Sequence, residues 1–119
     1  DPGERKLMEN VGLALEATDV IRSGPEAAAD LALRVAGDLP IVVHFDVDII
    51  DGREMATHLP AALGRGLPRT DVALLLRKLL KSPRVVALSV SGFDMDSDAD
   101  GSHARALVEI LAGALQKPN

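Results

Sequence analysis

Apolar positions in this chain follow two spacings, one typical of buried strands and one typical of helix faces. Residues 41–45 and 85–90 are short, largely apolar runs bounded by turn residues, which predicts buried strands at 40–47 and 84–91. Between these runs, apolar residues recur at the i, i+3, i+4 spacing of a helix: Val72, Leu75, Leu76, Leu79 and Leu80. An N-cap at Thr70-Asp71 and the stop at Ser82-Pro83 bound that predicted helix.

Two further helices are predicted outside this central part. Pro25, followed by an Ala- and Leu-rich stretch ending at Gly37, predicts a helix at about 25–36, and a second apolar face predicts one at 102–115. The first residues give weaker signals: 4–10 are helix formers, 13–17 fit a short strand, and 18–24 fit a connection. After Asp51-Gly52, a stretch without a clean period predicts a loop of about fifteen residues, a length typical of functional loops.

Buried strands that alternate with helices predict an α/β fold with a parallel sheet covered by helices on both faces. In such open sheets, ligands bind beyond the carboxyl ends of the strands. Two acidic segments lie at such ends: Asp46-Val47-Asp48 after the first strand, and the 92–101 loop after the second. The sequence therefore predicts that both segments could share one site.

Composition narrows the classes of partner. The chain has 119 residues, of which 47% are hydrophobic, so it fits one small domain or a piece of a larger one. A formal net charge of −5 argues against nucleic acid and anionic membranes as partners. Without cysteine there is no disulfide and no thiolate metal site. No apolar segment approaches the ~20 residues of a membrane span, so we expect a soluble chain.

Asp46 and Asp48 are the first candidates for chemistry. In a strand their side chains would point to the same face, about 7 Å apart along the chain. Neighbouring carboxylates repel unless a cation lies between them or one of them holds a proton. Hard divalent cations prefer such oxygen ligands, which makes the pair a candidate metal site. A solvated turn with an Asx-type hydrogen bond is the alternative interpretation.

The remaining candidates are histidines and acids near the same strand ends. His44 would lie on the face of the two acids, either orienting Asp46 or acting as a core histidine. His58 lies in the long loop, where it could contact substrate or be merely exposed, and His103 shows little sign of a ligand role. The loop starting at Asp94 resembles an EF-hand but has Ala99 and Arg105 at the positions that require Gly and Glu. Those acids are more simply a solvated turn before the last helix.

The run His44-Phe45-Asp46-Val47-Asp48-Ile49-Ile50-Asp51 resembles the Asp-x-Asp motif in the C-terminal half of the ureohydrolases, the family of arginase, agmatinase and formimidoylglutamase. Arg65-Gly66-Leu67 is similar to the family's Gly-Gly-Leu, and Asp98-Ala99-Asp100-Gly101 is similar to its Asp-Pro-Asp-Gly. The order of these parts covers nearly the whole chain. Residues 1–119 are therefore identified as the C-terminal portion of one ureohydrolase-like domain with a three-layer, arginase-like α/β/α fold.

The resemblance implies a manganese-dependent hydrolase of linear amidines, with a guanidino or formimino substrate and a metal-bridging hydroxide as nucleophile. It implies two Mn²⁺ per subunit, with Asp46 and Asp48 as metal ligands and His44, His58 and Asp94 as substrate-binding or supporting residues. It also implies a cytoplasmic homo-oligomer that acts without nucleic acid or membrane.

Two departures from the family pattern limit what this chain does alone. The family's other metal ligands, a Gly-Gly-Asp-His segment and an Asp-x-His-x-x-x-Asp set, have no counterpart in this sequence. We therefore expect the 119-residue chain by itself to be inactive. Gly92 stands where the family's substrate-binding Glu is expected, so either the substrate differs or Asp94 or Asp96 replaces that Glu from a neighbouring position. A ureohydrolase-like domain with a ligand-binding or assembly role but no catalysis is the alternative.

Overall fold

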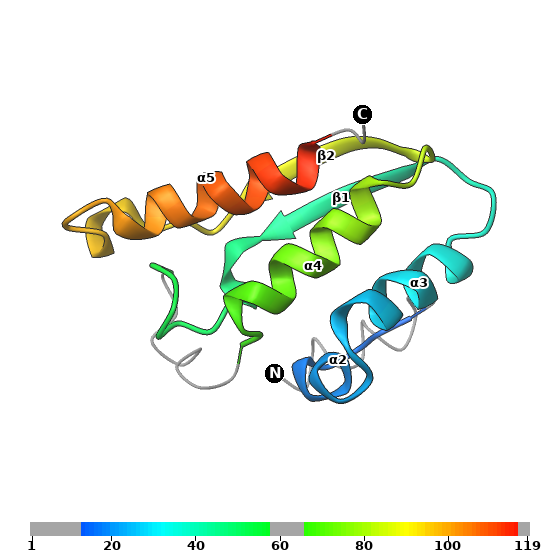
Figure 1. The fold of residues 1–119 in the computed structure, drawn as a ribbon, viewed down its shortest axis with the longest axis horizontal. Coiled ribbons are helices and arrows are strands. Elements are labelled where there is room, and N and C mark those ends of the chain that lie inside the picture. Colours follow the sequence, from blue (N-terminus) through cyan, green and yellow to red (C-terminus); the bar gives the residue numbers. More distant parts are fainter. Residues whose placement is uncertain (1–12, 58–65, 117–119) are drawn as a thin grey trace, which may run out of the picture.

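The computed structural model describes residues 13–57 and 66–116. Helices and strands alternate along most of this part of the chain (Figure 1). The elements in chain order are helices α2 (Ala17–Ser23) and α3 (Pro25–Val35), strand β1 (Ile41–Asp46), 3₁₀ turn η1 (Val47–Ile49), helix α4 (Arg69–Leu80), strand β2 (Val85–Ser91), 3₁₀ turn η3 (Met95–Ser97) and helix α5 (Ser102–Leu115).

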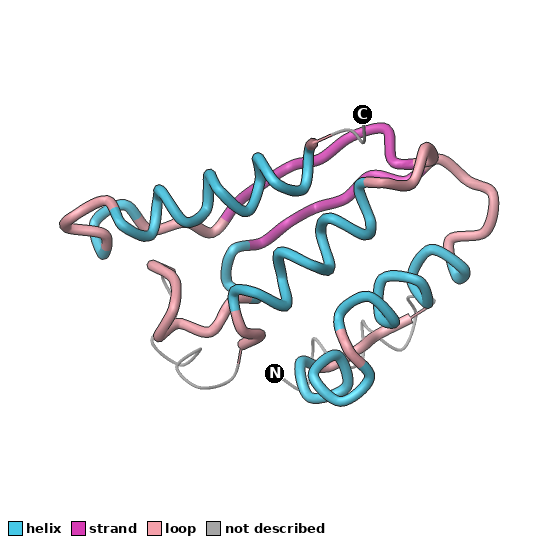
Figure 2. The backbone as a smooth tube through the Cα atoms, viewed as in Figure 1, coloured by secondary structure: helices cyan, strands magenta, loops and turns pink. Residues whose placement is uncertain are grey.

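The two predicted strands pair in parallel (Figure 2). Their register places Val43 opposite Leu88 and Asp46 opposite Ser91, with an irregularity between Ile41 and Val42. Because the strands are parallel, their carboxyl ends lie at the same edge of the sheet. The prediction of a parallel sheet flanked by helices is confirmed, and the segments that follow the two strands begin side by side.

One face of this strand pair forms the core. Phe45 is 4% exposed and packs in one cluster with residues of α4 and α5, among them Val72, Leu76 and Ile110. Helices α4 and α5 contact each other and run along the strands in Figure 1. The opposite face of the described sheet is open, and Val42 on it is 67% exposed. Alternation along β1 therefore separates a packed face from an open one.

The prediction for residues 13–24 was wrong. Residues 13–16 form no strand, and α2 occupies most of the segment that was predicted as a connection. A capping box explains the helix: the Asp19 side chain accepts a hydrogen bond from the Glu16 backbone N–H at 3.2 Å and also binds Arg22. Gly24, at φ 92°, then turns the chain into α3. Residues 4–10, predicted as helix formers, lie outside the described residues.

The later helices follow the predicted boundaries closely. Helix α3 is anchored to the start of β2 by Arg84, which donates to the Leu33 carbonyl at 2.8 Å and to the Gly37 carbonyl. A cation at this end of a helix also satisfies carbonyls that the helix leaves free. Helix α5 begins at Ser102 and ends at Leu115, as predicted. Among the described residues, no helix combines the length and apolar character that crossing a membrane requires.

The predicted long loop returns to the end of β1. Leu67 N–H donates to the Ile49 carbonyl at 2.8 Å, and Asp51 N–H donates to the Leu67 carbonyl at 2.9 Å. Gly66 makes this approach possible, because a Cβ there would lie 2.3 Å from the Asp51 nitrogen. The segment around Gly66-Leu67 is thereby fixed against the residues that follow the acid pair.

Candidate functional site

Strand β1 ends at Asp46, and the chain then turns through η1. The Asp46 side chain caps this turn: its Oδ1 accepts a hydrogen bond from the Asp48 backbone N–H at 3.0 Å. Val47 and Ile50 are fully buried beneath the turn. The strand ends one residue earlier than predicted, at Asp46 and not at 47, so strand alternation does not place Asp48. The carboxylates are presented by a turn anchored in the core, at the carboxyl end of a strand.

His44 lies on the open face of the sheet and binds the neighbouring strand. Its Nδ1 is 2.7 Å from the Ser89 hydroxyl oxygen, and its Nε2 is 3.2 Å from that of Ser91. The ring therefore links β1 to β2 through two serines, and its hydrogen bonds go to them rather than to Asp46. His44, Ser89 and Ser91 thus form one hydrogen-bonded group across the two strands. The two serines were not predicted as candidates from the sequence.

Asp94 caps the turn that follows β2. Its Oδ1 accepts from the Asp96 N–H at 3.1 Å, and its Oδ2 accepts from the Ser97 hydroxyl. The Asp94 backbone N–H donates to the Ala56 carbonyl at 3.2 Å, so this turn lies against the loop that follows β1. The two strand-end segments therefore contact each other, and that they share one site stays a prediction. His58, the remaining candidate, lies outside the described residues.

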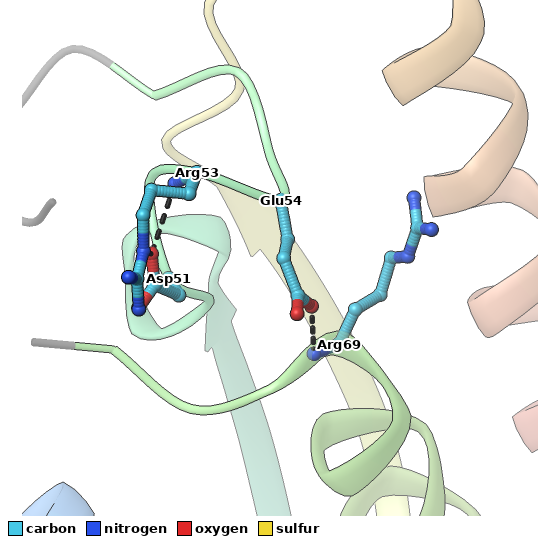
Figure 3. Close-up of polar contacts among 4 residues, drawn as sticks. All are labelled: Asp51, Arg53, Glu54 and Arg69. Atoms are coloured by element: carbon cyan, nitrogen blue, oxygen red, sulfur yellow. Dashed lines mark hydrogen bonds and ion pairs between the residues drawn. The ribbon is translucent and has the colours of Figure 1, made fainter. Parts of the chain in front are cut away.

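Asp51 was predicted only as a turn residue, but it is the buried charged residue of this region. It is 6% exposed, and its two oxygens accept from Arg53 Nε at 2.9 Å and a terminal guanidinium nitrogen at 2.8 Å (Figure 3). The hydrogen bond and charge of Asp51 raise the pKa of the Arg53 guanidinium above its ordinary value. This bidentate pair offsets the cost of burying the carboxylate. From this buried position, Asp51 stabilises the turn through its hydrogen bonds to Arg53.

Glu54 connects the same loop to helix α4. Its Oε2 accepts a hydrogen bond from the Arg69 backbone N–H at 2.6 Å, as Figure 3 shows. The residue before the helix, Pro68, makes no side-chain cap, so Glu54 satisfies a free N–H of the first turn from a distance. A pattern of neighbouring residues could not reveal this contact, because it joins positions fifteen residues apart.

The last acids of the second loop serve helix α5. Asp98 accepts from the backbone N–H groups of His103 at 3.1 Å and Ala104 at 2.8 Å. Hydrogen bonds from the Ser102 side chain and backbone lower the pKa of Asp100. The interpretation of this segment as a turn that charges the start of α5 fits these contacts.

Gly92 brings the end of β2 against the Asp46 carboxylate. A Cβ at this position would lie 2.2 Å from Asp46 Oδ1, closer than real contacts allow. The backbone there has φ +85°, a conformation that favours glycine. Position 92, where the resemblance expects a Glu, therefore offers no side chain to a ligand in this arrangement.

The donor atoms of this region match part of a metal centre. Asp46 and Asp48 offer the carboxylate oxygens that Mn²⁺ prefers. Among the described residues, however, no group of three or more His, Cys, Asp or Glu side chains could hold a metal ion. The residues present therefore do not fit a complete binuclear centre.

A groove between α4 and α5 is a further concave feature. It has a volume of about 360 Å³ and is lined by Ala73, Leu74 and Arg77 of α4 and by Ile110, Gly113 and Ala114 of α5, among others. Its lining is mostly apolar and includes neither acid of the candidate pair. The candidate acids therefore lie at the strand ends and outside this groove.

Comparison with known proteins points to one group of folds. No family model and no curated protein sequence matches the chain. Among solved structures, arginase from Bacillus caldovelox superposes with a TM-score of 0.85 and 16% identity over 99% of this chain and 40% of that protein. The chain has an arginase-like fold. The structural resemblance predicted from the Asp46-Val47-Asp48 motif is confirmed at the level of the fold.

Two other enzymes of this group give similar superpositions. A hypothetical agmatinase from Burkholderia thailandensis has a TM-score of 0.72 and 21% identity over 83% of this chain and 31% of its own. Formiminoglutamase from Trypanosoma cruzi, solved with Mn²⁺, has a TM-score of 0.72 and 20% identity over 82% of this chain and 33% of its own. The arginase-like chain thus spans between 31% and 40% of the lengths of these three structures.

Proposed function

We propose that this chain is part of a manganese-dependent hydrolase that cleaves C–N bonds in linear amidines. The observation that carries the proposal is the Asp46–Asp48 turn: two carboxylates at the carboxyl end of strand β1, in an arginase-like fold. The Mn²⁺ in the formiminoglutamase structure supports the choice of metal. Hydrolysis of a guanidino compound adds one water and releases an amine and urea, and hydrolysis of a formimino compound releases an amine and formamide.

The role of this chain is to supply two of the metal's ligands. Asp46 is held by the Asp48 N–H, so at least one of its oxygens has a fixed position before a cation arrives. Ligands from polypeptide outside the described residues complete the site. Bound Mn²⁺ would lower the pKa of a coordinated water so that hydroxide is available near neutral pH.

For the whole protein we propose two Mn²⁺ per subunit and a small guanidino or formimino substrate. We also propose that it is a cytoplasmic homo-oligomer. His44, His58 and Asp94 stay candidates for contacts around the substrate. By itself the 119-residue chain is expected to be inactive, because it lacks a complete ligand set among its described residues.

A ureohydrolase-like domain without catalysis is the second candidate. The specific observation in its favour is Gly92, since the Asp46 carboxylate fills the space that a side chain there would need. On this hypothesis the strand-end turn binds a small ligand or serves assembly, and removal of the metal leaves the function unchanged.

Metal binding tests the first proposal. Mn²⁺ titration of the full-length gene product, followed by electron paramagnetic resonance, should show binding that weakens at least ~10-fold in Asp46→Asn and in Asp48→Asn. Asp96→Asn is the matched control, because it removes one charge from the second Asp-x-Asp turn and should change affinity less than ~3-fold.

Activity tests the chemistry. The full-length gene product with Mn²⁺ should release urea or formamide from one member of a panel of guanidino and formimino compounds, and Asp46→Asn should abolish the release. If the full-length protein binds no Mn²⁺ and releases neither product, the hydrolase proposal is wrong and the non-catalytic domain is favoured.

A further inference from the structure

Gly92 and the Asp46 carboxylate occupy the same small space. A Cβ at position 92 would lie 2.2 Å from Asp46 Oδ1 and 3.3 Å from both Asp46 Cγ and the Val47 nitrogen. Register explains the approach, since Asp46 pairs with Ser91, the last residue of β2, and Gly92 follows it directly. The carboxylate therefore lies over the end of the neighbouring strand, in the place that a side chain at 92 would take.

The oxygen in this place is the one that caps the turn. Asp46 Oδ1 accepts the Asp48 N–H at 3.0 Å and is also the atom nearest to the missing Cβ of Gly92. The position of Asp46 Oδ1 is therefore set by two neighbours: the Asp48 N–H on its own turn and Gly92, which follows the neighbouring strand. Any side chain at 92 would push Oδ1 away from that donor or force the two strand ends apart.

We propose that Gly92 is the positioning residue of the acid pair: by having no side chain, it lets Asp46 adopt the orientation in which Oδ1 binds the Asp48 amide. Gly92 touches no ligand itself and acts only through Asp46. Its consequence for a metal rests on the proposed function, whereas its effect on the Asp46 orientation does not.

The absence of a Glu at position 92 follows from this arrangement. A Glu at 92 and Asp46 in its present orientation exclude each other, so the glycine is part of how this site is built. A cationic substrate group would have to be recognised by a residue other than 92.

The test compares two glycines that share a positive φ. Gly92 has φ +85° and Gly24 has φ +92°, but a Cβ at 24 would meet nothing within 4 Å. Gly92→Ala and Gly24→Ala both place a side chain at a φ that favours glycine, and only the first collides with Asp46. In ¹H–¹⁵N and carboxyl ¹³C spectra of the metal-free chain, Gly92→Ala should shift the Asp48 amide and Asp46 carboxyl signals. Gly24→Ala should leave both signals in place, and unchanged signals in Gly92→Ala would overturn the proposal.

A second variant separates the contact from general destabilisation. Adding Asp46→Ala to Gly92→Ala removes the colliding carboxylate, so the urea midpoint of the double variant should rise relative to Gly92→Ala alone. If Gly92→Ala does not fold but the double variant does, the collision is demonstrated. If the double variant is as destabilised as Gly92→Ala or also fails to fold, Asp46 is not what Gly92 accommodates, and the proposal is wrong.

Manganese titration of the same variants links the two proposals while keeping their failures distinct. Where the full-length wild type binds Mn²⁺, Gly92→Ala should weaken binding at least ~10-fold, and Gly24→Ala should change it less than ~2-fold. Unchanged affinity in Gly92→Ala would show that the metal does not depend on this orientation and would contradict the positioning role. Absence of binding in the full-length wild type counts against the metal proposal alone, because the spectra of the metal-free chain still decide the role of Gly92.

Discussion

The two parallel strands end in the same local motif, and the molecule uses the two copies differently. The Asp46 turn (residues 46–50) starts with the last residue of β1, and the Asp94 turn (residues 94–98) starts with an aspartate three residues after the end of β2. In each, the first aspartate accepts the backbone N–H two residues later, at 3.0 Å in one turn and 3.1 Å in the other. This hydrogen bond needs only the first aspartate, because Asp51 and Asp100 accept the backbone N–H groups of Arg53 and Ser102 in the same way.

The difference lies in what the turn packs on. Val47 and Ile50 of the Asp46 turn are fully buried, whereas Met95 of the Asp94 turn is 78% exposed. The Asp46 turn is also enclosed by Leu67 on one side and Gly92 on the other. An Asx-type hydrogen bond is worth only ~1 kcal/mol, so it cannot by itself fix a side chain. Burial of the neighbouring apolar residues does so, which makes the Asp46 turn the better place for a preorganised ligand.

Truncating one apolar residue of each turn, Ile50 and Met95, should give the largest difference between the two turns. Ile50→Ala should lower the free energy of unfolding by about 2–5 kcal/mol, because it leaves a cavity in the core. Met95→Ala should change it by less than ~0.5 kcal/mol, since the side chain is exposed. Urea unfolding of both variants is the measurement. Equal effects would show that the Asp46 turn is not anchored as described.

Adding a side chain at Gly66 should give the next largest effect on the free energy of unfolding. A Cβ there would lie 2.3 Å from the Asp51 nitrogen, so Gly66→Ala should cost about 1–3 kcal/mol through overpacking. Gly113→Ala is the matched control, because its Cβ would meet Arg77 only at 3.8 Å and helix propensity should stabilise α5 by about 0.5–1 kcal/mol. Opposite signs in urea unfolding are expected, and a neutral Gly66→Ala would contradict the close approach of the loop.

Removing Asp98 should have a moderate effect confined to the second loop. Its carboxylate accepts two backbone N–H groups at the start of α5, so Asp98→Ala should cost about 0.5–2 kcal/mol. Amide hydrogen exchange should become faster at His103 and Ala104, while exchange at Asp48 stays unchanged. Faster exchange at Asp48 would show that the two turns are coupled.

The smallest expected effect is on the pH dependence of stability, which involves Asp100 in the second loop. The pKa of Asp100 is lowered in the folded chain, so its ionised form contributes stability above the ordinary value of 3.8. That contribution is lost as the pH falls below 3.8 and through the lower folded pKa. The stability of Asp100→Asn should therefore depend less on pH than that of the wild type in this window, as urea midpoints at several pH values can check. Identical pH profiles would mean that Ser102 does not stabilise the ionised form.

Much of the fold could be predicted because period and burial agree in the central residues. The apolar runs at 41–45 and 85–90 predict the two strands, although not the open face of the described sheet. The stripe of α4 predicts both the helix and the face that it buries. Helix α2 could not be predicted in this way, because it is short and has Val20 as its one core residue. Its formation depends on a capping box instead of an apolar period.

The candidate site, too, was predicted from the sequence only where its residues are close together in the chain. Asp46 and Asp48 were identified from the sequence because their spacing is local, and their roles as metal ligands stay a prediction. The burial of Asp51, the contact of Glu54 with Arg69 and the hydrogen bonds of His44 to two serines join separate parts of the chain. Such contacts depend on the register of β1 with β2 and on the return of the loop at Gly66-Leu67, which no local pattern encodes.

The sequence by itself determined the alternation of helices and strands and the two Asp-x-Asp turns, because these depend on residues within a few positions of one another. Only the tertiary structure decided that one turn is anchored in the core and the other is exposed. It also decided that the space above Gly92 belongs to the Asp46 carboxylate, since parallel pairing alone brings those two residues together. The physical reason is that side-chain packing acts between strands far apart in sequence, whereas capping hydrogen bonds act within one turn.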